Sequence, residues 1–288
     1  MKISDMFNKG APVVSFEFFP PKTPEGTEAL YRTVEALVPC RPSFVSVTYG
    51  AMGSTRDRTI DLVTRIKREL GIETMAHLTC VGSTRDEIRD ILKRLRDGGI
   101  ENVLPLRGDP PKGETEFRAV EGGFGYASEL VHFIRDEGFD FCLGAACYPE
   151  GHVECGDQEK DLENLANKVR QGVDFLITQL FFDNSDYLSF VRRARRAGIE
   201  LPIVPGLMPV TNVAQTERFT GMCGSRIPAE LGRRLRIVEA DASAVVATGA
   251  LWIADQAREL LQNGAPGVHF YTLNKSSATL AVHAALGL

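Results

Sequence analysis

A repeated unit, made of an amphipathic helix, a glycine and a short apolar strand, recurs along this sequence of 288 residues. It is clearest at five glycines that are each followed by an apolar run: Gly71, Gly99, Gly172, Gly198 and Gly267. A glycine suits the left-handed residue just past a helix end. The apolar runs lack strict alternation with polar residues, which is typical of strands covered on both faces in a parallel sheet. The pattern therefore predicts helices that alternate with parallel strands.

The segments between the apolar runs have the spacing of helices with one buried face. One such face consists of Ile88, Ile91, Leu92 and Leu95. Thr84 and Glu87 stand just before it with the spacing of a capping box, in which both residues satisfy free backbone amides. A further helix is predicted over Asp161–Gln171.

Eight strands are predicted in total, at Pro12–Phe18, Ser43–Thr48, Thr74–Thr79, Asn102–Leu106, Asp140–Cys147, Asp174–Leu180, Pro202–Gly206 and Gly267–Tyr271. Their alternation with helices favours an α/β fold, a closed (β/α)8 TIM barrel forming a single domain over residues 1–288. An open doubly wound sheet is the alternative, and the absence of a GxGxxG motif counts against it. The longest gap between strands, Leu207–Pro266, carries two or three helical stretches.

Composition narrows the class of protein. A content of 43% hydrophobic and 25% charged residues is ordinary for a globular chain. The net charge is −5 with acidic and basic residues intermixed, so we expect no nucleic-acid partner. Apolar stretches fall short of the ~20 residues that span a bilayer, so no membrane association is expected. Residues 1–6 do not resemble the start of a signal peptide, and a cytoplasmic location is the expectation.

The six cysteines include no CxxC pair and are expected to be reduced thiols. Cys147, His152 and Cys155 could form part of a metal site, but their spacing matches no common zinc pattern. We therefore expect no metal.

Polar residues gather where the predicted strands end, which is where β/α barrels place their active sites. They are Glu17, Thr48, His77, Thr79, Asp109, Tyr148, His152, Gln179, Asn274 and Lys275. Glu17 stands between Phe16 and Phe18, and apolar surroundings would raise the pKa of its carboxyl and suit it to general acid catalysis. An ion pair with Arg56 or Arg58 is the alternative, and position alone does not decide between the two.

Other candidates also have two interpretations. Asp109 could bind a heterocycle, but an Asx-type turn before Pro110 is favoured. His77, on an apolar strand, is more often a core histidine than a base. Gln179 would be costly to bury without partners, so a pocket position is favoured.

Asp161, Asn164 and Lys168 share one helical face, near the start of a predicted helix. That face could hold ribose and phosphate groups, with Lys168 as the cation. From spacing alone a solvated helix face is favoured.

These residues lie in motifs that closely resemble those of methylenetetrahydrofolate reductases. The matching segments are Ser15–Pro21, Val45–Ala51, His77–Cys80, Leu106–Asp109, Tyr148–His152, Ile177–Asp183, Pro205–Pro209 and His269–Asn274. They occur in the family's order and span nearly the whole chain. An ordered set of this kind is far more specific than any single motif.

The resemblance implies an enzyme of one-carbon metabolism, serving methionine biosynthesis, built as a barrel that holds FAD non-covalently. NAD(P)H reduces the flavin and leaves, and 5,10-methylenetetrahydrofolate then takes its place. Glu17 would protonate N10 of the folate, which opens the five-membered ring to a 5-iminium cation. Hydride transfer to this cation gives 5-methyltetrahydrofolate. Asp109 would help to stabilise the cation.

The resemblance also implies the binding residues. For FAD they are Thr48, Tyr49, His77, Arg107, Gly108, Asp109, Tyr126, Ala127, Ser128, Tyr148, His152, Asp161, Asn164 and Lys168. For the folate or the nicotinamide they are Glu17, Asp109, Gln179, Gln215, Phe219 and Lys275. Asn167 and Lys275 stand where relatives often have arginine, and lysine keeps the charge but loses the bidentate geometry.

Relatives are dimers or tetramers, so a homo-oligomer is expected, and no C-terminal regulatory domain is expected. Two other functions stay open. A flavin-free barrel that transfers a methyl group from a pterin would give no reason for Asp161, Asn164 and Lys168. A catalytically idle flavoprotein subunit that passes electrons to a partner would give no reason for an intact Glu17.

Overall fold

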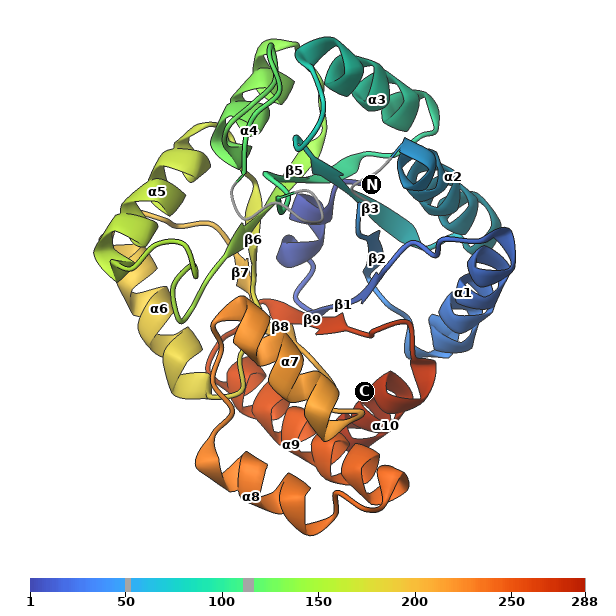
Figure 1. Ribbon diagram of the computed structural model, residues 1–288, viewed down its shortest axis with the longest axis vertical. Coiled ribbons are helices and arrows are strands. Elements are labelled where there is room, and N and C mark those ends of the chain that lie inside the picture. Colours follow the sequence, from blue (N-terminus) through green and yellow to red (C-terminus); the bar gives the residue numbers. More distant parts are fainter. Residues whose placement is uncertain (50–52, 111–116, 288) are drawn as a thin grey trace.

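The computed structural model describes residues 1–49, 53–110 and 117–287, with the side chains of residues 53–56 left aside, as a ring of helices around parallel strands (Figure 1). The strands are β1 (Val13–Phe18), β2 (Phe44–Val47), β3 (Glu73–Thr79), β4 (Asn102–Leu106), β5 (Cys142–Cys147), β6 (Phe175–Thr178), β7 (Ile203–Val204), β8 (Gly206–Leu207) and β9 (Gly267–Tyr271). The helices are α1 (Pro24–Leu37), α2 (Gly53–Leu70), α3 (Arg85–Asp97), α4 (Ala127–Asp136), α5 (Gln158–Arg170), α6 (Asn184–Arg196), α7 (Val213–Cys223), α8 (Ala229–Ile237), α9 (Ala242–Gln262) and α10 (Ser276–Leu286). Two 3-10 helices, η1 (Ile3–Asn8) and η2 (Val38–Cys40), complete the set.

The strands form one parallel sheet in the order β7-β6-β5-β4-β3-β2-β1-β9-β8. Its two end strands are pieces of one segment, because only Pro205 separates β7 from β8. β7 pairs with β6 and β8 pairs with β9, so the sheet closes on itself at Pro205. The (β/α)8 barrel predicted from the sequence is therefore confirmed, with its seventh strand broken in two. The segment changes its partner from β6 to β9 at Pro205, which has no backbone N–H to donate to either strand.

The helix predicted over Asp161–Gln171 is present as α5 but begins earlier, at Gln158, and ends at Arg170. Thr84 caps α3 by accepting from the amide of Glu87, and the Glu87 side chain accepts from the Thr84 amide, so the capping box is confirmed. The predicted long insertion before the last strand contains α7, α8 and α9.

One of the five repeat glycines has a different role from that expected. The left-handed residue after α9 is Gly264, with φ of 86°, and not Gly267. Gly267 is the first residue of β9, and a Cβ atom there would lie 2.0 Å from the carbonyl oxygen of Val13. Glycine is needed at this position because two backbones come close together, a role that the sequence pattern does not distinguish from a helix end.

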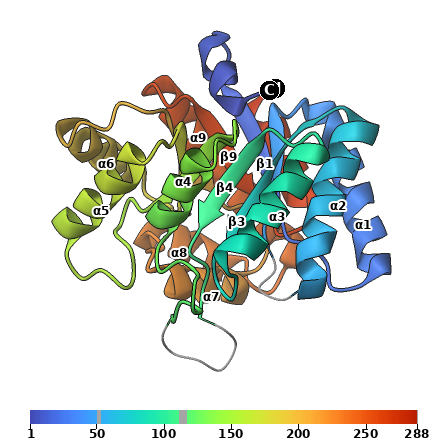
Figure 2. The same ribbon diagram turned by 90° about the horizontal axis from the view of Figure 1, so that it is seen from above.

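The barrel interior changes from apolar to polar along its axis. At the end where the strands begin, Phe44, Met75 and Phe175 pack with Ile3 and Met6 of η1 in one apolar cluster. Figure 2 shows η1 at the end of the barrel opposite to α7 and α8. Farther along the strands the interior carries buried serine, histidine and glutamate side chains. Among the described helices none is long and apolar enough to cross a membrane.

Candidate active site

Glu17 is the centre of a buried polar cluster inside the barrel, where it is 7% exposed. Its Oε2 atom lies 3.2 Å from Nε2 of His269 on β9 and 3.3 Å from Nε2 of His77 on β3. Ser46 on β2 donates a long hydrogen bond of 3.5 Å to the same oxygen. Because β3 is not a neighbour of β1 in the sheet, the contact with His77 crosses the barrel interior.

The expectation of a raised pKa for Glu17 is wrong. Burial does raise it, but the nearby charge of His77 and the hydrogen bond from His269 outweigh burial and lower the pKa to about 2. Phe16 and Phe18 belong to the core between barrel and helices, since alternate residues of a strand face opposite sides. The phenylalanines next to Glu17 in the sequence therefore do not surround its carboxyl group in the structure.

The alternative ion pair with Arg58 is also wrong. The Arg58 guanidinium donates to the carbonyl oxygens of Pro21 and Lys22. The side chain of Arg56 lies outside the described residues. The partners of Glu17 are the two imidazoles and the Ser46 hydroxyl.

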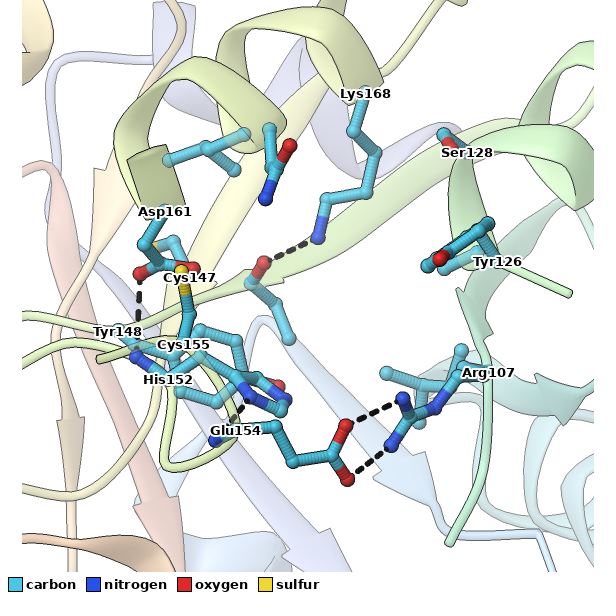
Figure 3. Close-up of a pocket in the computed structure, with 15 residues that line it drawn as sticks. Arg107, Tyr126, Ser128, Cys147, Tyr148, His152, Glu154, Cys155, Asp161 and Lys168 are labelled. Atoms are coloured by element: carbon cyan, nitrogen blue, oxygen red, sulfur yellow. Dashed lines mark hydrogen bonds and ion pairs between the residues drawn. The ribbon is translucent and has the colours of Figure 1, made fainter. Parts of the chain in front are cut away.

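A cavity of about 370 Å³ opens beside the ends of β4 and β5, a volume typical of small-molecule sites (Figure 3). Nine residues that the resemblance assigns to FAD line it: Arg107, Tyr126, Ala127, Ser128, Tyr148, His152, Asp161, Asn164 and Lys168. The remaining lining residues are Leu106, Ala146, Cys147, Glu154, Cys155 and Leu165. Side chains that are far apart in the sequence are thus brought together by the strand ends and α5.

α5 contributes one wall of this cavity. Lys168 points its ammonium group into the cavity, where Nζ donates to the carbonyl oxygen of Ala146 at 2.7 Å (Figure 3). Asp161 accepts from the amide of His152 at 3.2 Å. In the part of the chain that the structure describes, no carboxylate lies within 4 Å of the Lys168 ammonium. Spacing alone favoured a solvated face for Asp161, Asn164 and Lys168. In the structure this face is instead a wall of the cavity, and the Lys168 ammonium group lies in it.

The N-terminal amides of α5 are occupied by the chain itself. Asp157, the N-cap residue, accepts from the amides of Glu159 and Lys160. An anion in the cavity therefore depends on side-chain cations more than on the helix N-terminus.

Arg107 and Glu154 face each other across the cavity (Figure 3). Both terminal nitrogens of Arg107 lie 2.6 Å from the two carboxylate oxygens of Glu154, in a bidentate pair. The guanidinium also lies 5.0 Å from the ring centroid of Phe117. Glu154 raises the pKa of Arg107 and is itself lowered in pKa by that arginine.

The remaining cofactor residues expected from the resemblance lie outside this lining. Thr48 and Tyr49 follow β2 and are partly buried, and His77 faces Glu17. Gly108 has φ of 89°, and Asp109 is exposed at the turn that precedes residues 111–116, which are not described.

Gln215 and Lys275, two of the residues expected to bind the folate, both contact the hydroxyl group of Thr211. Thr211 donates to Oε1 of Gln215 at 3.3 Å, and Nζ of Lys275 donates to the Thr211 hydroxyl at 3.5 Å. Phe219 packs partly buried against the core, and Oε1 of Gln179 accepts from the neighbouring amide of Leu180 at 2.8 Å. Gln179 follows β6, Thr211 follows β8, and Lys275 follows β9, while Gln215 and Phe219 are on α7. All of these side chains therefore belong to segments that follow the ends of strands.

Sequence reasoning missed Ser15, Ser46, His269 and Glu154. Ser15 and Glu17 are two residues apart on one strand, so they share a face, and this signal was available. His269 is a polar residue within an apolar strand, the same signal that identified His77. Nothing in the spacing of Glu154 connects it with Arg107, which is 47 residues away.

No metal centre is evident. In residues 1–49, 53–110 and 117–287, no group of three or more histidine, cysteine or acidic side chains has a geometry that could hold a metal ion.

The family model described as "Methylenetetrahydrofolate reductase" matches residues 2–287. The chain belongs to the methylenetetrahydrofolate reductase family. It is 39% identical to 5,10-methylenetetrahydrofolate reductase of Escherichia coli K12, over 96% of this chain and 90% of that protein. It is also 39% identical to methylenetetrahydrofolate reductase (NADH) 1 of Arabidopsis thaliana, over 100% of this chain and 50% of that protein. The chain thus spans about half the length of its plant relatives.

Solved structures agree on the fold. An uncharacterised protein from Clostridium thermocellum that binds two copies of 5-methyl-5,6,7,8-tetrahydrofolic acid superposes with a TM-score of 0.67, at 18% identity and over 100% of both chains. Dihydropteroate synthase from Xanthomonas albilineans superposes with a TM-score of 0.51, at 12% identity, over 96% of this chain and 91% of that one. At these identities the likeness is one of fold.

Proposed function

We propose that the protein catalyses the flavin-dependent reduction of 5,10-methylenetetrahydrofolate to 5-methyltetrahydrofolate with NAD(P)H as the electron donor. The observation that carries the proposal is a buried Glu17 within 3.3 Å of two imidazoles in a barrel of this family. This cluster can hold and deliver a proton, which the ring opening of the folate requires. The cavity beside β4 and β5, lined by nine of the residues that the resemblance assigns to FAD, supplies a place for the flavin.

The cavity residues fit FAD. Lys168 brings a cation without a carboxylate neighbour among the described residues, which suits a pyrophosphate oxygen. Arg107 is a second cation, and Asp161 and Asn164 can bond to ribose hydroxyls. When bound, FAD takes hydride from NAD(P)H and supplies it to the folate.

Glu17 acts on N10 of the folate. Before substrate binds, its low pKa keeps the carboxyl ionised. A folate that covers the barrel mouth excludes water, and loss of water disfavours the charged form of the carboxyl. A proton then passes from His77 to Glu17, and Glu17 donates it to N10. This protonation breaks the bond from N10 to the bridging carbon and leaves the iminium cation at N5.

Folate binding falls to residues near the same mouth. Lys275, exposed beside Thr211 and Gln215, can meet a folate carboxylate. Asp109 and Gln179 follow β4 and β6, where they can bond to the pterin ring. The negative charge of Asp109 would stabilise the cationic intermediate.

The visible spectrum of the purified protein tests the proposal. We expect the bands of an oxidised flavin, which bleach anaerobically with NADH or NADPH and return when methylenetetrahydrofolate is added. Colourless protein that also fails to bind added FAD would contradict the proposal. Colourless protein that transfers a methyl group from a pterin would favour the methyltransferase, and bleaching without recovery on folate would favour an idle flavoprotein subunit.

Glu154→Gln is expected to strengthen FAD binding by about 1.4- to fivefold, because exposed ion pairs contribute roughly 0.2–1 kcal/mol. Glu154 competes with the pyrophosphate for the Arg107 guanidinium, and glutamine competes less because it has no charge. Quenching of flavin fluorescence during titration of apoprotein gives the Kd.

Glu163→Gln is the matched control. Glu163 also lies in an exposed ion pair, with Lys160 on α5, but does not line the cavity. Its substitution makes the same change in net charge and should leave the Kd unaltered. Weaker or unchanged FAD binding in Glu154→Gln would show that Glu154 does not compete for Arg107.

A further inference from the structure

The two imidazoles that contact Glu17 are held in different ways. The His269 ring is 0% exposed, stacks on Phe44 with centroids 6.0 Å apart and lies perpendicular to the Tyr271 ring with centroids 5.3 Å apart. Its Nδ1 atom lies 2.8 Å from Oγ of Ser15, while its Nε2 atom faces Glu17. Both ring nitrogens of His269 and the face stacked on Phe44 therefore have fixed neighbours.

His77 is less constrained at the nitrogen that faces Glu17. Its Nε2 lies 3.3 Å from Oε2, but in the described part of the chain this atom has no hydrogen bond of good geometry. A proton can therefore move between His77 and Glu17 with a small rotation of either side chain. The same rotation of His269 would break its bond to Ser15.

The ionised state of Glu17 fixes where the hydrogen of His269 lies. A carboxylate oxygen only accepts hydrogen bonds, so Nε2 at 3.2 Å must carry a hydrogen. In the neutral ring Nδ1 is then an acceptor, and the Ser15 hydroxyl donates to it. The alternative acceptor for that hydroxyl, the carbonyl oxygen of Val268, is more distant at 3.5 Å.

We propose that Ser15 and His269 are positioning residues for Glu17. Ser15 holds the imidazole as its neutral Nε2–H tautomer, and Nε2–H fixes Oε2 of Glu17 in every step. His77, whose Nε2 lies 3.3 Å from the same oxygen, is left as the partner that exchanges a proton with Glu17. The kinetic part of this proposal rests on the proposed reductase activity.

The tautomer can be measured without any substrate. The protein contains five histidines, and protein labelled with nitrogen-15 histidine gives separate long-range proton–nitrogen patterns for each tautomer and for the imidazolium. The spectrum of His269→Gln assigns the signals of His269. At neutral pH we expect the neutral Nε2–H pattern. An Nδ1–H or an imidazolium pattern would overturn the proposal, whatever the activity of the protein.

Three variants test the positioning role in single-turnover reduction of folate by the reduced protein. His269→Phe fills the ring space but donates no hydrogen bond, and we expect the rate to fall about 10- to 100-fold. His269→Gln places an amide N–H near the position of Nε2 and cannot become charged, and we expect recovery to within about fivefold of the parent rate. Ser15→Ala should cost roughly two- to tenfold, the value of one hydrogen bond.

The controls distinguish loss of the positioning role from general damage to the protein. They also distinguish it from the case in which the protein is not a folate reductase. His132→Gln makes the same substitution at an exposed histidine on α4 and should leave the rate unchanged. Equal losses for His269→Gln and His269→Phe, or equal losses in flavin reduction by NAD(P)H and in folate reduction, would overturn the positioning role. If no folate is reduced by the parent protein, the reductase proposal fails, while the tautomer measurement still decides the Ser15–His269 contact.

Discussion

Glu17→Gln is expected to slow folate reduction by roughly 10²- to 10⁴-fold, the usual contribution of a general acid, while NAD(P)H still bleaches the flavin at close to the parent rate. Glutamine keeps the size of the side chain and can still bond to His269, but it has no proton to give to N10. Reduction of the flavin by the nicotinamide uses no proton from Glu17. Anaerobic stopped-flow absorbance measures the two half-reactions separately.

Glu73→Gln is a useful control for this variant. Glu73 is also a well-buried carboxylate on a barrel strand, with 10% of its side chain exposed, but it lies at the opposite end of β3 from the cluster and pairs with Lys67. Its substitution can lower stability without touching the chemistry, so the folate rate should persist. Folate reduction at the parent rate in Glu17→Gln would remove Glu17 from the general acid role and leave His77 as the remaining candidate.

Gly267→Ala is expected to prevent stable folding, with a loss of more than about 4 kcal/mol in the free energy of unfolding. The added Cβ would lie 2.0 Å from the Val13 carbonyl oxygen and 2.7 Å from two further backbone atoms of Val13. Backbone atoms within paired strands cannot move aside as a side chain can. The β1–β9 pairing would separate at its first residue pair. Typical domains have only about 5–15 kcal/mol of stability in total, so we expect largely insoluble protein or a sharply lowered urea midpoint.

Gly221→Ala provides the comparison. Gly221 lies within α7, and nothing occupies the 4 Å around a Cβ built there. Alanine is the better helix former by about 1 kcal/mol, so this variant should be as stable as the parent or more stable. Equal stability of Gly267→Ala and the parent in urea would mean that β1 and β9 are not packed as closely as the structure has them.

The architecture could be predicted from local patterns because each repeat contains its own helix, its own helix end and its own apolar strand. Where the prediction differed, the cause was a contact between distant segments. The break at Pro205 depends on β6 and β9 lying on either side of it. Gly267 was read as a helix end because its actual neighbour, Val13, is at the other end of the sequence.

Contacts between distant segments also explain why only part of the site could be predicted. Glu17 was identified by its motif, but its pKa was predicted in the wrong direction because the controlling groups are not its sequence neighbours. His269 is 252 residues away and His77 is on a strand that does not pair with β1. The cavity wall formed by Asp161, Asn164 and Lys168 came from the resemblance, since helical spacing does not distinguish an outward face from a face turned to a cavity.

The pairing of β1 with β9 sets an order of events during synthesis. β1 is made first, yet one of its edges has no partner until Gly267–Tyr271 has emerged. Until then that edge is open to incorrect pairing with other chains, a hazard of slow, long-range strand pairing. The same late strand delivers His269 to Glu17, so an incomplete chain contains the acid without the imidazole that fixes it. Closing the barrel and completing the cluster around Glu17 are therefore a single event.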